Sequence, residues 1–527
     1  MALNTFDLLQ IATAIVPDRT AFISGKEPKR RATFSEIENR ARKLATALKD
    51  AGVVRGDRVA MMEVNGFEFG EAFFACVLLD AVFVPVNYRA RVSEVAEMLH
   101  EISPRAVISG QRYASLLDEA IVSSRQATAR IVIGAAPGWD SYDALIDASV
   151  PADISPRASD SDAAMIIFTS GTSTQPKGVV LTHSSFCGYV MSNVDPADPD
   201  PESAERTLLT VPLYHIAGAQ AMMAGIYGGR TLVLQPQFEP ESWLRLVQDE
   251  KVSLAMVVPT MLKSLLEHET FGDWDLSSLN VITYGAAAMP EAVLLSALEK
   301  FPNAQFINAF GQTETASTIT QLSPADHRLV GTPEQIEEKR ARLRSIGRPL
   351  PDVEVRIVDE TGNQVAQGDT GEIIARGERL MKGYWNQPEA TAGALQSGWL
   401  HTGDLGWSDE DGYIFLAGRA REFIKRAGEM ISPEEVESIL DQHPAVAESA
   451  VIGIPDETWG EVVHAIVVPA PGASSDQDAI IHWCRERMAS FKRPEAVHFV
   501  DELPRSQLGK VMKSQLREQF HDTTTSE

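Results

Sequence analysis

Short apolar strands alternate with amphipathic helices along the first three hundred residues, and this alternation constrains the fold most. Residues 58–62 and 81–85 have the apolar, β-branched composition of buried strands, and residues 71–79 between them read as a helix. The same rhythm returns between residues 207 and 284. Strand–helix–strand units of this kind form mostly parallel sheets covered by helices. The sequence therefore predicts an α/β fold with two α/β subdomains in a large N-terminal domain.

The periodicity changes after residue 352. Val353, Val355 and Ile357 alternate with polar residues, which is typical of a small antiparallel sheet or barrel. Near Gly418 the composition becomes basic, and the remaining chain has the size and pattern of a compact α+β domain. We predict an N-terminal domain over residues 1–418, which ends in a small β-barrel-like subdomain, and an α+β C-terminal domain over residues 419–527.

The composition limits the possible partners. A net charge of −26 over 527 residues argues against nucleic acid or an anionic membrane surface as the main partner. The longest apolar run, residues 72–86, contains Asp80 and is too short to span a bilayer. The three cysteines have no metal-ligand spacing, as expected in a reducing compartment. We predict a cytoplasmic protein with small-molecule partners, without nucleic acid and without a transmembrane segment.

A hydroxyl-rich loop lies within FTSGTSTQPKGVVLTH, residues 168–183, between two short strands. Small side chains allow backbone N–H groups to approach a phosphate, and Lys177 supplies a positive charge. The loop is not a Walker A motif, because Pro176 stands where its second glycine belongs. The pattern alone permits either a phosphate site or a solvated turn. Its hydroxyl and glycine residues include Thr169, Ser170, Gly171, Thr172 and Ser173.

Small and polar residues also follow other predicted strands, in PLYHIAG (212–218), YGAAAMP (284–290) and NAFGQTET (308–315). Ligands of α/β sheets bind outside the carboxyl ends of the strands. Each stretch could equally be a tight turn, and a lone His215 could be a core residue. In GWLHTGDLG (398–406), Asp404 in a glycine turn could bind a sugar diol or only cap the turn.

Read in order, these motifs resemble those of the adenylate-forming enzymes, in their acyl-CoA synthetase branch. The series continues with GYWNQPEAT (383–391), GRAREFIKRAGEMISPEEVE (418–437) and PRSQLGK (504–510), so the resemblance covers nearly the whole chain. It implies two steps: a carboxylate attacks ATP to give an acyl-adenylate and pyrophosphate, and a thiol then displaces AMP. It also implies Mg²⁺, coenzyme A as co-substrate, and that the C-terminal domain, residues 419–527, is a mobile lid that moves between the steps.

The resemblance assigns roles to individual residues. Lys177 and the hydroxyl loop would hold the β- and γ-phosphates, Thr313 the α-phosphate and Glu314 the Mg²⁺ ion. Asp404 and Arg419 would bind the ribose, and Lys510 would bridge the carboxylate and the ribose or phosphate oxygens as charge moves. The adenine slot would be lined by Gly285, Ala286, Ala287, Asn308, Ala309, Phe310 and Gly311.

The resemblance also places the remaining ligands. Coenzyme A would lie near Lys425 and Gly428, and Arg421 would be the hinge, where the family more often has Asp or Lys. Pocket residues for the acyl group are His215, Ala217, Tyr284 and Gly285.

The substrate implied is a fatty, cyclic or arylalkyl acid. PLYHIAG lacks an aspartate for an amino-acid ammonium group, and Ala217 stands where plant hydroxycinnamate ligases tend to carry a ring, which favours an aliphatic chain. Two alternatives stay open: an enzyme that passes the acyl group to a carrier protein, and a non-catalytic binding homologue. The sequence does not report the oligomeric state, for which a homodimer is one option.

Overall fold

The computed structural model describes residues 4–26, 28–124, 129–169, 176–419, 422–426, 429–456, 459–474, 476–505 and 511–521. The chain forms two compact units. The first contains Met1–Leu343, Pro349–Glu354 and Ala375–Leu400, and the second contains Arg344–Arg348, Val355–Ile374 and His401–Glu527. The domain boundary expected between residues 418 and 419 stays a prediction.

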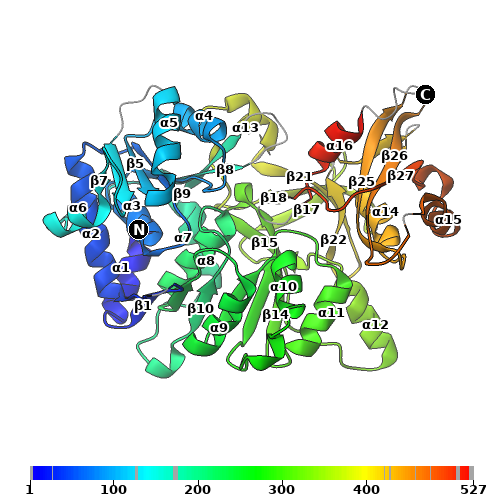
Figure 1. The fold of residues 1–527 in the computed structure, drawn as a ribbon, viewed down its shortest axis with the longest axis horizontal. Helices are drawn as coiled ribbons and strands as arrows, with labels where there is room; N and C mark the ends of the chain where they lie inside the picture. Colours follow the sequence, from blue (N-terminus) through cyan, green and yellow to red (C-terminus); the bar gives the residue numbers. More distant parts are fainter. Residues whose placement is uncertain are drawn as a thin grey trace. The chain divides into compact units, whose positions relative to one another are not determined.

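The first unit contains a nine-stranded sheet with the order β16-β15-β14-β13-β12-β10-β11-β1-β2 (Figure 1). The pairs from β1 to β14 are parallel, whereas β2 and β15 pair antiparallel with their neighbours, so the mostly parallel sheet is confirmed. Its strands are β1 (Thr20–Ser24), β2 (Arg31–Thr33), β10 (Arg206–Leu209), β11 (Thr231–Leu234), β12 (Leu254–Val257), β13 (Val281–Gly285), β14 (Gln305–Gln312), β15 (Ser317–Leu322) and β16 (Arg348–Pro349).

The same unit contains an eight-stranded sheet with the order β19-β9-β8-β4-β3-β5-β6-β7. The strands that flank the hydroxyl loop, β8 and β9, form an antiparallel pair, and the loop residues 170–175 lie outside the described residues. The strands are β3 (Arg58–Met62), β4 (Val82–Pro85), β5 (Ala106–Gly110), β6 (Ala129–Ile133), β7 (Asp140–Ser141), β8 (Ala163–Thr169), β9 (Lys177–Thr182) and β19 (Gly383–Tyr384).

A layer of helices lies between the two sheets. Phe6, Phe73, Phe186 and Met222, from α1, α3, α7 and α8, belong to one buried core with residues of both sheets. Figure 1 shows α7 and α8 in this layer, and α4 and α5 pack on the opposite face of the eight-stranded sheet. The helices of this unit are α1 (Thr5–Ile15), α2 (Phe34–Asp50), α3 (Phe67–Leu78), α4 (Val92–Ile102), α5 (Ala114–Ser124), α6 (Tyr142–Ala148), α7 (His183–Asn193), α8 (Ile216–Tyr227), α9 (Pro240–Glu250), α10 (Pro259–Leu266), α11 (Glu291–Lys300), α12 (Pro333–Arg342) and α13 (Pro388–Ala394).

Two small sheets follow residue 352. One is the sheet expected there, with the order β17-β18-β21-β20 and β22 paired with β21. Its pairs β20–β21 and β21–β22 are antiparallel, and β20 itself belongs to the first unit. Its strands are β17 (Glu354–Val358), β18 (Gly371–Arg376), β20 (Leu395–Gln396), β21 (Trp399–Ser408) and β22 (Ile414–Arg419).

The other small sheet belongs to the α+β region near the C-terminus and has the order β24-β23-β26-β25, with β27 paired with β26. Its elements are β23 (Ile424–Arg426), β24 (Glu429–Ile431), α14 (Pro433–Leu440), β25 (Val446–Asp456), β26 (Gly460–Pro469), α15 (Gln477–Arg487), β27 (Ala496–Phe499) and α16 (Lys513–His521). Across all the ranges given above, the structure contains no helix long and apolar enough to cross a membrane.

Candidate functional site

The carboxyl end of β13 is a tight and strained turn. Gly285 pairs with Ala309 of β14, and a Cβ atom on Gly285 would lie 2.2 Å from the Ala309 carbonyl oxygen, so only glycine fits this pairing. The next residue, Ala286, has φ of +67°, in the left-handed region that costs an alanine roughly 1–2 kcal/mol. Such strain is concentrated at ligand sites. The backbone from Gly285 to Ala287 therefore has the features of a surface that approaches a ligand closely.

The neighbouring strand, β14, is longer than predicted from the sequence. Residues 308–312 were expected in a glycine turn, but β14 continues to Gln312 because β15 pairs with it antiparallel, with a register shift between Phe310 and Gly311. The turn is instead the 3₁₀ segment Thr313–Thr315, which we call the Glu314 turn. The predicted adenine residues of β14 are half-buried, as are Thr313 and Glu314.

Tyr384 connects two residues that the sequence assigned to ATP and Mg²⁺. The Nζ atom of Lys177, the first residue of β9, lies 4.9 Å from the centre of the Tyr384 ring. The Tyr384 hydroxyl donates a hydrogen bond to Oε1 of Glu314, at 3.0 Å. Tyr384 was not among the predicted site residues, although it belongs to the GYWNQPEAT motif.

The chain before Tyr384 fixes the backbone of the Glu314 turn. Arg379 is 1% exposed and donates hydrogen bonds to the carbonyl oxygens of Thr315 (3.2 Å) and Thr318 (2.5 Å). Its Nε atom lies 2.6 Å from Oδ2 of Asp352, so the buried charge is paired. The Met381 N–H donates to the Glu314 carbonyl oxygen, at 2.9 Å. The turn is therefore held by its backbone, independently of the Glu314 side chain.

The predicted acyl residue Tyr284 takes part in a buried hydrogen-bonded chain. Its hydroxyl lies 2.9 Å from Nε2 of His327, and Nδ1 of His327 lies 2.8 Å from the Ser323 carbonyl oxygen. Since a carbonyl oxygen only accepts, Nδ1 carries the proton and Nε2 accepts from Tyr284. Burial raises the pKa of Tyr284 and lowers that of His327, so both side chains are neutral at pH 7.

His215 is the N-cap residue of α8, in the PLYHIAG stretch. Burial lowers the pKa of its imidazole to about 4, and its buried Nε2 atom has no hydrogen-bond partner among the described residues. A buried polar atom without a partner is a group that a bound substrate could satisfy. Ala217, in the first turn of α8, is half-buried.

Asn65 holds the chain that leads to His215. Its Nδ2 atom donates to the carbonyl oxygens of Leu209, Val211 and Gln235, at 3.1–3.4 Å, and its Oδ1 accepts from the Leu213 N–H at 2.9 Å. These bonds use the hydrogen-bonding capacity of the buried Asn65 side-chain amide. They fix the PLYHIAG stretch at the end of β10.

In the second unit, Asp404 is not in a glycine turn as expected. It lies within β21, is 6% exposed, and is paired in register with Arg419 of β22. The alternation of β21, in which every second residue is buried, turns Asp404 inward. Lys425 lies in β23. Seven predicted site residues lie outside the described residues: Ser170, Gly171, Thr172, Ser173, Arg421, Gly428 and Lys510.

The donor set suits a metal ion that is bound mainly by a nucleotide. The residues that the structure describes contain no cluster of three or more His, Cys, Asp or Glu side chains able to hold a metal. Mg²⁺ in nucleotide enzymes needs only one or two carboxylates, because phosphates and water supply its other oxygen ligands. The single half-buried Glu314 fits that requirement.

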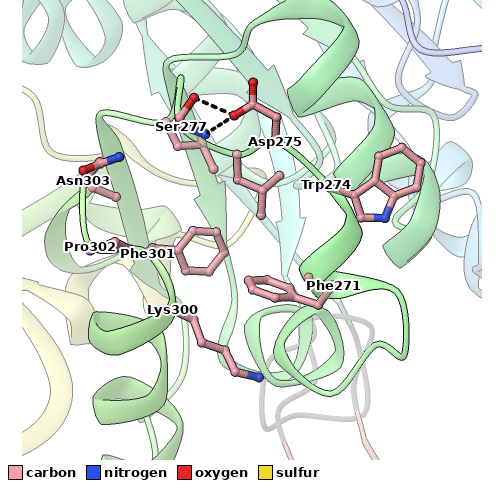
Figure 2. A pocket seen from close by; sticks show the side chains of 12 residues that line it. Phe271, Trp274, Asp275, Ser277, Lys300, Phe301, Pro302 and Asn303 are labelled. Atoms are coloured by element: carbon pink, nitrogen blue, oxygen red, sulfur yellow. Dashed lines mark hydrogen bonds between the residues drawn. The ribbon is translucent and has the colours of Figure 1, made fainter.

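A cavity of about 340 Å³ lies at the opposite, amino ends of β13 and β14 (Figure 2). Phe271 and Phe301 meet there edge to face, with ring centres 5.4 Å apart. Two of its charged groups are already bonded: Asp275 accepts from the N–H and Oγ of Ser277, and Lys300 donates to the Leu266 carbonyl oxygen. None of the predicted site residues lines this cavity, so we do not regard it as the functional site.

The profile described as "AMP-binding enzyme" matches residues 9–385, and the profile described as "AMP-binding enzyme C-terminal domain" matches residues 435–510. The chain is 34% identical to an indoleacetate–CoA ligase of Aromatoleum aromaticum, over 95% of each chain. It is 35% identical to a feruloyl-CoA synthase of an Amycolatopsis species, over 93% of this chain and 94% of that protein. The solved structure of the anthranilate CoA ligase AuaEII in complex with anthranoyl-AMP superposes with a TM-score of 0.86 at 28% identity, over 98% and 97% of the two chains.

Proposed function

The chain belongs to the AMP-binding enzyme family, in its acyl-CoA ligase branch, and on this premise we propose that it is an ATP-dependent carboxylate–CoA ligase. The observation that carries the proposal is the convergence of Lys177, in β9, and Glu314, in the Glu314 turn, on Tyr384. A phosphate-binding cation and a metal-binding carboxylate are what an enzyme needs to neutralise ATP during attack by a carboxylate.

In the first step, the substrate carboxylate attacks the α-phosphorus of ATP, forming a P–O bond as the bond to pyrophosphate breaks. Lys177 and the hydroxyl loop bind the β- and γ-phosphates, and Thr313 binds the α-phosphate. When bound, Mg²⁺ at Glu314 neutralises phosphate charge. The strained backbone at Ala286 and the half-buried residues 308–311 form the adenine slot, with Asp404 and Arg419 on the ribose.

In the second step, the thiol of coenzyme A attacks the acyl carbonyl carbon and AMP leaves. We assign Lys425 and Gly428 to coenzyme A and Arg421 to the hinge of the C-terminal domain, following the family motif. The cytoplasmic location and the homodimer stay predictions. The three cysteines, Cys76, Cys187 and Cys484, are buried thiols, which is compatible with a reducing compartment.

The substrate that we propose is an arylalkyl carboxylic acid. The sequence interpretation favoured an aliphatic acid, whereas the indoleacetate, feruloyl and anthranilate relatives are named for aromatic acids. Two small residues of the proposed acyl pocket, Ala217 and Gly285, leave room for a ring. The neutral imidazole of His215, whose Nε2 atom has no partner in the described part of the chain, offers one polar contact in that pocket.

The test is pyrophosphate release from ATP across a panel of arylalkyl, aryl, cyclic and fatty acids, each with and without coenzyme A. We expect sustained release only when an acid and coenzyme A are both present, with arylalkyl acids the best substrates. A single burst of release that coenzyme A does not convert into turnover would favour a carrier protein as acceptor. No pyrophosphate release with any acid would favour the non-catalytic alternative.

Lys510→Ala separates the two steps. We expect the activation free energy of acyl-adenylate formation to rise by about 3 kcal/mol or more. The rate of thioester formation from a supplied acyl-adenylate should be largely retained. Equal losses in both half-reactions, measured by single-turnover kinetics, would contradict the role of Lys510.

A further inference from the structure

We propose that Tyr384 is a positioning residue that keeps the phosphate-binding lysine and the metal-binding carboxylate apart and ready for ATP. The inference rests on the proposed function, which gives Lys177 and Glu314 their ligands. It goes further by naming the side chain that sets their arrangement before ATP binds.

The strand register places the Tyr384 ring beside Lys177. In the antiparallel pair of β19 and β9, Tyr384 lies opposite Val179. Since side chains two residues apart share one face of a strand, Lys177 and Val179 are on the face that the Tyr384 ring covers. The Trp385 N–H also donates to the Gly178 carbonyl oxygen, at 2.7 Å. The backbone therefore fixes the ring against the lysine.

Strand β19 is also anchored on its other side. The Tyr384 N–H donates to Oγ1 of Thr391 in α13, at 2.9 Å. Gly383 has φ of +149°, and a Cβ atom there would lie 2.7 Å from Cγ2 of the same threonine. This close packing requires glycine and leaves Tyr384 little freedom to move.

The tyrosine hydroxyl orients a carboxylate whose backbone is already fixed. Met381 and Arg379 hold the Glu314 turn through carbonyl oxygens, so the bond from Tyr384 acts on the side chain alone. A lysine and a glutamate in a shared, half-buried site attract each other strongly enough to pair. Yet within the residues that the structure describes, no ion pair joins Lys177 and Glu314.

Tyr384 accounts for this separation. Its ring binds the ammonium group through a cation–π contact, and its hydroxyl at the far end of the ring binds the carboxylate. Among the described residues, each charge has a weak partner that ATP and Mg²⁺ can displace, and neither is held in an ion pair that they would have to break. The two contacts are chemically different, so two substitutions can separate them.

The experiment compares Tyr384→Phe, which keeps the ring, with Tyr384→Leu, which removes both contacts. Tyr142→Phe is the matched control, because the buried Tyr142 hydroxyl donates to Oε2 of Glu71, at 2.9 Å, away from the proposed site. Binding of a non-hydrolysable ATP analogue is measured by calorimetry as Mg²⁺ is varied, and pyrophosphate release is titrated in parallel.

We expect Tyr384→Phe to raise the Mg²⁺ concentration for half-maximal analogue binding by about tenfold, with little change in the KM for ATP at saturating Mg²⁺. Tyr384→Leu should raise that KM by a further factor of about three. Tyr142→Phe should lower thermal stability only. A wild-type Mg²⁺ titration for Tyr384→Phe, or the same shift for Tyr142→Phe, would overturn the proposal. If the wild-type protein binds the analogue but never releases pyrophosphate, the proposed function fails while the role of Tyr384 is still tested by binding.

Discussion

The two ends of strands β13 and β14 differ in backbone strain, in side-chain packing and in hydrogen bonding. At the carboxyl end, Gly285 lets two backbones approach closely and Ala286 is held in a strained conformation. At the amino end, Phe271 and Phe301 pack edge to face, and Asp275 is fully bonded. The cavity at the amino end is lined by none of the predicted site residues, whereas the strained backbone lies at the carboxyl end. In α/β sheets, ligands bind outside the carboxyl ends of the strands, so the presence of a cavity alone does not locate the site.

Exchanging glycine for alanine at each end tests this contrast most strongly. Gly285→Ala places a Cβ atom against the Ala309 carbonyl oxygen, whereas a Cβ atom on Gly272, beside the amino-end cavity, would meet nothing within 4 Å. We expect pyrophosphate release to fall by about 100-fold or more in Gly285→Ala, because small displacements of reacting groups are costly. Gly272→Ala should retain wild-type rates. Similar rates for both variants would contradict the assignment of the site to the carboxyl end.

Exchanging a carboxylate for an amide at each end should have a smaller effect. Glu314→Gln keeps an acceptor for Tyr384 but loses the charge, and we expect the Mg²⁺ requirement of pyrophosphate release to rise by about tenfold. Asp275→Asn is the control at the amino end, where hydrogen bonds from Ser277, with help from Lys251, lower the pKa of the carboxyl to about 2. Its Mg²⁺ titration should match the wild type. An unchanged titration for Glu314→Gln would count against a metal ligand there.

Shortening an aromatic side chain at the amino end should affect stability alone. Phe301 is 4% exposed and contacts Phe271 and Phe306. We expect Phe301→Leu to lower the free energy of unfolding by about 1 kcal/mol, measured by urea denaturation. The kcat and KM for ATP should stay within twofold of the wild type. A marked change in KM for ATP would show that the amino-end cavity communicates with the reaction.

The smallest effect that we predict is on pH dependence. Because the pKa of His215 falls from the usual 6.5 to about 4 on folding, acid protonates the unfolded chain first, and stability is lost as the pH falls from 6.5 towards 4. At pH 6.0 this amounts to about 0.8 kcal/mol from His215. In His215→Gln, the free energy of unfolding, measured by urea denaturation, should decrease by that much less between pH 7.5 and pH 6.0 than in the wild type. An equal decrease in the free energy of unfolding of both proteins would mean that His215 is protonated as easily in the folded chain as in the unfolded chain.

Local elements were predictable from the sequence to within a few residues. The strand predicted at residues 58–62 is β3 at Arg58–Met62, and the one predicted at residues 81–85 is β4 at Val82–Pro85. These features depend on neighbours in the sequence, such as apolar runs. The motif series also pointed to the Glu314 turn and to Lys177.

Features that depend on a distant strand were not predictable. β14 runs past its apolar segment because β15 pairs with it, and Asp404 lies in a strand because β22 pairs with β21. Tyr384 is significant only because β19 joins β9, which is about 200 residues earlier in the chain. Pairing between strands outweighs the local preference of residues such as glycine and aspartate for turns.

The pairing of β19 with β9 also has a consequence for how the protein is made. At about 5–20 residues per second, a ribosome needs roughly 10–40 s to proceed from Val180 to Gly383, and during this time β9 has no partner on its outer edge. In the other sheet, the N-terminal strand β1 likewise lacks its partner β11 until residues 231–234 have been synthesised. The nascent chain thus exposes an unpaired strand edge that invites aggregation. Neither sheet can be completed by the first half of the chain, so both sheets gain their full set of strand pairs only late in synthesis.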